Sequence, residues 1–250
     1  MAGQLKQTKY SSIRDQELPP WGRYPETAEE FDALVAASDE IFAATFDLFS
    51  DGTLTVGDLI LAPTAARALE AIEAFLAAMK QWNISTASVA VRLQVDNLLR
   101  ANLLEIVSDP MPIFECISKD RPLRKLKLPD ELLAMLPEQK RGQMKFYTDG
   151  ALQELASQTY PWVPHVYRAA SSYVHFSNSH IQSVFTAGPG NELNGRIPVD
   201  TGKFDAEFVS GLTGVMRAAS TTLVGQLARA VAKKRMSKDD AAHHDVSSSG

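Results

Sequence analysis

Apolar residues recur every three or four positions over long stretches of the chain, which is the spacing of one face of an α-helix. The first such stretch covers 26–50. Its helically spaced positions are Phe31, Leu34, Val35, Ser38, Ile41, Phe42, Phe46 and Phe49. Acidic residues crowd the first turn, where the helix dipole favours negative charge. The pattern predicts a helix that ends at the turn-forming sequence 51–53.

Two more long helices are expected directly afterwards. One should begin near Pro63, because proline suits the first turn of a helix, and run to about Trp82. The next should cover 84–108 and end before Pro110. Three long helices joined by short connections predict an antiparallel helical bundle.

The second half of the chain is also mainly helical in pattern. We expect a short helix at 130–136, a longer one at 138–157 interrupted at Gly150, another from about Pro161, and a last one over 204–235. The segment 186–203 is rich in Gly, Pro and Asn, so an irregular loop or short hairpin is expected around 180–203. No long alternating strand pattern is present, and the predicted fold class is all-α.

The helical pattern defines one domain with a tail at each end. Residues 1–25 are polar and carry three prolines, which predicts a flexible N-terminal arm. Residues 26–235 should form a single helical-bundle domain, a size that suits one domain. Residues 236–250, including the solvated pair His243 and His244, are expected to be disordered.

Composition and charge narrow the functional classes. The chain has 250 residues, 45% hydrophobic and 22% charged, and a net charge of -5, which argues against non-specific coating of nucleic acid but allows a local basic patch. Its single cysteine, Cys116, excludes a disulfide framework and a multi-cysteine zinc site, and is expected to be a core thiol. No secretory signal and no run of ~20 apolar residues is present. We expect a cytoplasmic protein without a membrane span, cofactor or metal.

Most candidate chemistry lies in 165–180, which holds three of the five histidines. At helical spacing His165, Arg168, Ser172, His175 and Ser179 form one stripe. The stripe lacks the Lys and Glu that usually cover a solvated face, and its side chains are suited to hydrogen bonding in a cleft. We therefore expect the stripe to face something specific.

Arg168 and His175 lie two helical turns apart, or about 10 Å. A guanidinium can bind phosphate oxygens bidentately, and an imidazole can transfer a proton near neutral pH. With RNA, His175 could take a proton from the 2′-hydroxyl or return one to the leaving oxygen, while Arg168 offsets the growing charge. This chemistry needs no metal.

The same residues carry a family resemblance. "RAASSYVH" resembles the Arg-x4-6-His signature of HEPN-domain proteins, and Tyr167, Ser171 and His175 are similar to the Tyr-x3-Ser-x3-His motif of related uncharacterised bacterial helical proteins. Those proteins often carry an Arg followed four residues later by an acid, and Arg92 and Asp96 are similar. The resemblance covers roughly 84–184.

The resemblance implies a HEPN-like all-α fold in the central part of the chain. It also implies a metal-independent endoribonuclease, or an RNA-binding protein, of a bacterial defence or toxin type. In such enzymes a homodimer brings Arg and His together, so Arg168 and His175 would be catalytic. Tyr167, Ser171, Ser172, Arg92 and Asp96 would then support them. Active members usually place a polar residue after the Arg, and Ala169 departs from this.

Other interpretations of these residues remain open. Arg168 and His175 could belong to a hydrogen-bonded seam against Arg92 or Asp96, or form the face through which a non-catalytic protein binds a partner or small ligand. A metal site at His175, His180 and Asp96 is the least favoured, because its spacing is poor.

Two further groups of charged residues can be interpreted either as structural or as functional. The basic residues Arg121, Arg124, Lys125 and Lys127 suggest either a solvated loop or an RNA-backbone contact. Arg92, Asp96 and Arg100 could simply form an ion-pair ladder on a helix surface.

Overall fold

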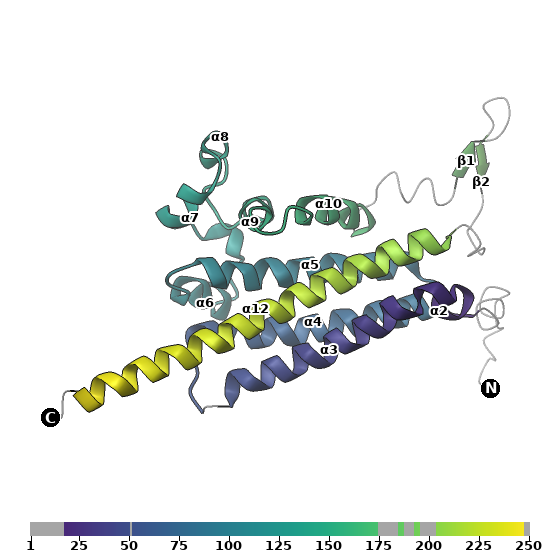
Figure 1. Ribbon diagram of the computed structural model, residues 1–250. Helices are drawn as coiled ribbons and strands as arrows, with labels where there is room; N and C mark the ends of the chain where they lie inside the picture. Colours follow the sequence, from purple (N-terminus) through teal and green to yellow (C-terminus); the bar gives the residue numbers. More distant parts are fainter. Residues whose placement is uncertain (1–17, 51, 175–184, 188–192, 196–203, 248–250) are drawn as a thin grey trace, which may run out of the picture.

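The computed structural model describes residues 18–50, 52–174, 185–187, 193–195 and 204–247. Four long helices run side by side and form the body of the molecule (Figure 1). They are α3 (Ala28–Phe49), α4 (Val56–Lys80), α5 (Ile84–Ile106) and α12 (Ala206–Ser247). The predicted all-α fold class is thereby confirmed, and helices α3, α4 and α5 follow one another as expected.

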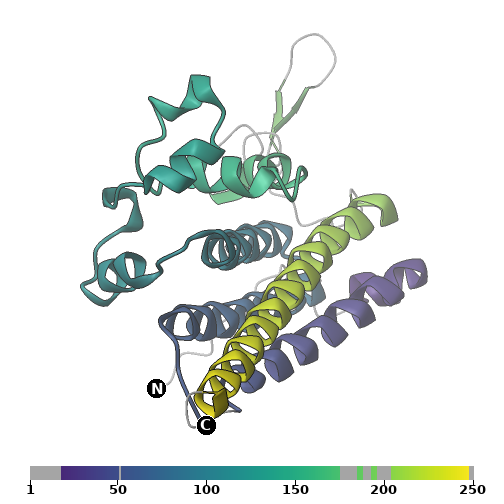
Figure 2. The same cartoon turned by 60° about the vertical axis from the view of Figure 1, so that its left-hand side comes forward.

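Shorter helices form a second layer on α5, on the side away from α4 (Figures 1 and 2). The layer consists of α9 (Asp149–Ser157) and α10 (Val163–Val174), which pack on α5. The chain reaches it through α6 (Met111–Ser118), which contacts α4, and then through η2 (Leu123–Lys125), α7 (Asp130–Met135) and α8 (Glu138–Arg141). The expected short hairpin is present as β1 (Phe185–Ala187) paired antiparallel with β2 (Leu193–Gly195).

Helix α4 begins seven residues before the predicted start at Pro63. Thr55 is its N-cap: the Thr55 hydroxyl accepts from the backbone N–H of Asp58 at 3.1 Å, and the Asp58 carboxylate accepts from the N–H of Thr55 at 2.8 Å. This reciprocal capping box satisfies two N–H groups that would otherwise lack partners, so the helix starts there. Pro63 lies inside the helix with its side chain exposed, so the prediction that the helix starts near Pro63 was wrong.

The predicted helix over 138–157 is two separate helices. Helix α8 ends at Arg141, and Lys127 pairs with Phe146 in an isolated antiparallel bridge before α9 begins. Thr148 caps α9, its hydroxyl accepting from the N–H of Ala151 at 3.3 Å. The break lies before this cap and not at Gly150, because a new helix needs an N-cap residue and Gly150 already lies in the first turn.

Only one side of the apolar pattern in α3 is buried. Leu34, Ile41 and Leu48 are fully buried against α4 and α12. Phe42 and Phe46, in contrast, are 66% and 69% exposed, and Val35 and Phe49 are exposed as well. Within the described part of the chain the helix has neighbours on one side only, so its apolar pattern spans more of its circumference than the bundle covers.

The core consists of two clusters that meet along α5. The larger one joins α3, α4, α5 and α12, and the second lies between α5 and the layer of short helices. A buried hydrogen bond of 2.8 Å from Gln94 to Ser220 links α5 to α12. Lys234 of α12 lies 2.9 Å from Asp58 of α4, and the two side chains are only 8% and 5% exposed.

The segments expected to be flexible, 1–25 and 236–250, are only partly described: 18–25 and 236–247 contain helical structure, and 1–17 and 248–250 lie outside the described residues. Leu18 accepts a 2.7 Å hydrogen bond from the indole of Trp82, and helix α2 (Pro20–Arg23) and the 3-10 turn η1 (Pro25–Thr27) follow it. Trp21 and Tyr24 pack on the larger core cluster, and aromatic burial of this kind fixes a segment that prolines alone would leave extended.

At the other end, α12 continues to Ser247 through residues expected to be disordered. The sequence 236–247 contains no Gly or Pro to end the helix. Among the described residues, no helix is both long and apolar enough to span a bilayer.

Candidate functional site

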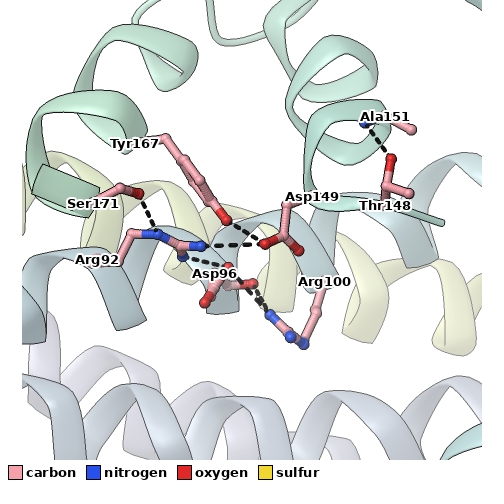
Figure 3. Close-up of polar contacts among 8 residues, drawn as sticks. All are labelled: Arg92, Asp96, Arg100, Thr148, Asp149, Ala151, Tyr167 and Ser171. Carbon is pink, nitrogen blue, oxygen red and sulfur yellow. Dashed lines mark hydrogen bonds and ion pairs between the residues drawn. The ribbon is translucent and has the colours of Figure 1, made fainter. Parts of the chain in front are cut away.

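The Arg92 side chain is the centre of a polar network between α5 and α10 (Figure 3). Its Nε donates to the Ser171 hydroxyl at 3.0 Å, and its Nη2 lies 3.5 Å from Oδ2 of Asp149. Its Nη1 lies 2.6 Å from Oδ1 of Asp96, an ion pair that lacks the geometry of a hydrogen bond. One guanidinium therefore joins three helices, α5, α9 and α10.

Tyr167 adds a second set of contacts to this network. The guanidinium carbon of Arg92 lies 3.3 Å from the centroid of the Tyr167 ring. The Tyr167 hydroxyl donates to Oδ2 of Asp149 at 2.6 Å. Because tyrosine offers both a ring face and a donor, it holds the cation and the carboxylate in one arrangement.

The network is largely withdrawn from solvent. The side chains of Arg92 and Asp96 are 12% and 16% exposed, whereas Asp149 is 64% exposed. Arg100 extends it along α5, with Nη1 donating to the Asp96 carbonyl at 2.9 Å and lying 3.6 Å from its carboxylate. The expected ion-pair ladder of Arg92, Asp96 and Arg100 is present, but it is half-buried and not a solvated surface run.

The structure brings together four of the five predicted supporting residues: Arg92, Asp96, Tyr167 and Ser171 all belong to this network. Ser172 does not join them, and its hydroxyl donates to the carbonyl of Ala169 at 2.7 Å. Sequence reasoning missed Asp149. No local pattern marks it, because its partners Arg92 and Tyr167 come from other helices.

Of the two predicted catalytic residues, the structure describes Arg168 but not His175. Arg168 is exposed on α10, as are Ala169 and, one turn earlier, His165. His175 and His180 lie outside the described residues. The described residues place Tyr167 and Ser171, and not Arg168, in the seam against Arg92, and the expected contact of His175 with this seam stays a prediction.

The predicted RNA-binding run is exposed in the connection that leads to the second layer. Arg121, Arg124, Lys125 and Lys127 are all exposed, two of them within the short turn η2. The carbonyl of Arg121 accepts from the thiol of Cys116 at 3.3 Å, and Cys116 itself is buried, as expected for a core thiol.

Three arginines from separate elements line a cleft beside the network. Arg67 of α4, Arg100 of α5 and Arg124 of η2 border a space of about 450 Å³ that Asp149 also lines. Burial, and after it the nearby Arg100, lowers the pKa of Arg67, while Asp96 and Glu70 act in the opposite direction. Arg67 was not singled out by the sequence, because the arginines that share the cleft with it come from elements distant along the chain.

The part of the chain that the structure describes contains no group of three or more His, Cys, Asp or Glu side chains placed to hold a metal ion. Comparison with protein-family models, with curated proteins and with solved structures gives no match for this chain.

Proposed function

We propose that this chain is a HEPN-like, cytoplasmic homodimer that acts on RNA as a metal-independent endoribonuclease. One observation carries the proposal: the two faces of α10 are used differently. Ser171 accepts a hydrogen bond from Arg92, and Tyr167 donates one to Asp149 while its ring contacts Arg92, whereas Arg168, on the same helix, is exposed. The inward contacts fix the helix, and the exposed guanidinium remains available for a phosphate.

In the proposed reaction the RNA 2′-hydroxyl attacks the adjacent phosphorus, and the 5′-oxygen of the next nucleotide leaves. His175, placed by sequence spacing seven residues after Arg168, receives the proton of the 2′-hydroxyl or returns one to the leaving oxygen. A homodimer supplies two such histidines, one for each proton. Arg168 stabilises the negative charge that grows on the phosphoryl oxygens.

The Arg92 network has a positioning role in this proposal. Its contacts to Tyr167 and Ser171 hold the last turns of α10, from which His175 follows directly. The exposed basic run 121–127 would contact the RNA backbone at some distance along the strand. Ala169, where active HEPN members usually have a polar residue, favours the alternative of RNA binding without cleavage.

The test incubates the purified full chain with structured and unstructured RNA in EDTA. Cleavage should persist in EDTA and fall at least about a hundredfold in His175→Ala and in Arg168→Ala, the usual loss for a proton-transfer group or a charge-stabilising donor. His165→Ala is the matched control on the same helix and should cleave normally.

Light scattering should report a dimer, and filter binding separates cleavage from binding alone. If the wild-type chain binds RNA without cutting it, the catalytic part of the proposal is refuted. If it neither binds nor cuts RNA, or if His175→Ala cleaves as fast as wild type, the whole proposal fails.

A further inference from the structure

The cleft lined by Arg67, Arg100 and Arg124, which we call the arginine cleft, has no role in the proposed cleavage reaction. It lies between α4, α5, α6, η2 and the start of α9, and its volume of about 450 Å³ is within the range of small-molecule sites. The three cations come from segments far apart in sequence, so only the folded chain assembles them.

The charges of the arginine cleft are unbalanced. Within the described residues, Arg67 and Arg124 make no hydrogen bond or ion pair, and Arg100 shares Asp96 with Arg92. Among the described residues that line the cleft, Asp149 is the single carboxylate, and it is already engaged by Arg92 and by the Tyr167 hydroxyl. Asp96 and Glu70, which are not part of the lining, offset some of the charge of Arg67. Placing Arg67 next to Arg100 costs free energy through mutual repulsion, which a bound anion would relieve.

The walls of the arginine cleft are mostly apolar. They include Leu59, Pro63, Phe114, Ile117 and Leu123. A simple inorganic anion would leave this surface uncovered, whereas a ligand with a flat apolar body and an anionic end would use both parts of the cleft.

Tyr147 supplies a specific polar group in the cleft wall. The residue is only 4% exposed but lines the cleft, and its hydroxyl makes no hydrogen bond to another described residue. Burial, and after it the charge of Glu131, raises its pKa to about 12, so the hydroxyl stays protonated at neutral pH. A protonated hydroxyl on the cleft wall can donate a hydrogen bond to an acceptor of a bound ligand.

We propose that the arginine cleft binds a nucleoside monophosphate unit. Arg67, Arg100 and Arg124 hold the phosphate, the base packs on the apolar wall, and the Tyr147 hydroxyl donates to an acceptor on the base. The unit is either a free nucleotide or the 5′-phosphorylated end of an RNA strand, which present the same chemistry. The inference does not depend on Arg168 and His175, and it holds whether or not they cleave RNA.

The test measures binding to the full chain by isothermal titration calorimetry. The probes are AMP, adenosine, inorganic phosphate, and a short RNA with either a 5′-phosphate or a 5′-hydroxyl. AMP should bind at least about tenfold more tightly than adenosine or phosphate, because only AMP fills both parts of the cleft. Its affinity should fall as salt is raised.

The variants locate the site. Arg67→Ala and Arg124→Ala should each weaken AMP binding about tenfold or more, and Tyr147→Phe by a smaller factor. Arg67 and Arg124 make no hydrogen bond or ion pair with the described residues, so the melting temperatures of both variants should remain near that of wild type. Arg168→Ala and the distant Arg235→Ala are controls that should bind AMP as wild type does.

The RNA probes distinguish the two sources of the ligand. Tight binding that requires the 5′-phosphate assigns the cleft to an RNA end, and binding of AMP without RNA assigns it to a free nucleotide. The proposal is overturned if neither AMP nor the 5′-phosphorylated RNA binds, or if the Arg67→Ala, Arg124→Ala double variant binds them like wild type. Loss of RNA cleavage in Arg168→Ala with intact AMP binding would separate this site from the proposed catalytic one.

Discussion

Replacing Arg92 with methionine should destabilise the protein because one side chain joins α5, α9 and α10. Methionine keeps much of the aliphatic stem and removes the charge. The hydrogen bond to Ser171 from a charged donor contributes about 1.5 kcal/mol. The contact with the Tyr167 ring contributes about 1 kcal/mol, and the ion pair with Asp96 about 0.5 kcal/mol.

The sum is about 3 kcal/mol, at the lower end of the roughly 3–5 kcal/mol found when a fully buried pair is broken. The lower value fits because Asp149 is 64% exposed and can be hydrated once Arg92 is gone. For a chain of this length, a loss of about 3 kcal/mol lowers the melting temperature by roughly 6–12 °C.

Thermal and urea unfolding followed by circular dichroism measure this change. Arg92→Lys should fall between wild type and Arg92→Met, since lysine restores the charge but neither the planar ring contact nor the fork of donors. Arg235→Met is the matched control, because the Arg235–Asp47 pair is exposed at 61% and 51% and should contribute little. Equal stability losses in Arg92→Met and Arg235→Met would refute the central role of the network.

Two further predictions concern other parts of the fold. Lys234→Met should cost about 3 kcal/mol or more in unfolding free energy, since it leaves the Asp58 carboxylate buried opposite an apolar side chain. A loss below about 1 kcal/mol in urea unfolding would contradict this. Tyr147 should ionise near pH 12, against an ordinary value of 10.0. The folded state thus holds this proton more tightly, so the stability it contributes is complete below pH 10 and is lost as pH rises toward 12. Absorbance titration of wild type against Tyr147→Phe checks this, and a tyrosine difference signal centred near pH 10 would be inconsistent with it.

The helical pattern predicted the fold class because apolar periodicity reports burial on a helix face directly. It predicted the extent of α5 well, since Asn83 caps its start and the chain turns extended at Val107. It failed at α4, where proline statistics suggested Pro63 and the capping pair Thr55 and Asp58 was the stronger local signal. It also overestimated how much of α3 is buried, because a sequence does not show on which side neighbouring helices pack.

Sequence patterns also predicted only part of the site. Motif spacing singled out Arg92, Asp96, Tyr167 and Ser171, and the structure places all four in contact. Asp149 and the arginine cleft could not be predicted, because their partners are supplied by separate helices whose packing no local pattern describes. The roles of Arg168 and His175 stay predictions.

Helix α12 imposes an order on folding during synthesis. Its Arg217 pairs with Glu30 at 2.6 Å and its Arg235 with Asp47 at 3.3 Å, across 187 and 188 residues of sequence. At translation rates of about 5–20 residues per second, the residues of α12 that pair with α3 are synthesised roughly 10–40 s after their partners in α3. During that interval the inner face of α3 has no α12 to cover it. The nascent chain should therefore depend on chaperones, or on slow elongation, more than a bundle closed by sequential helices would.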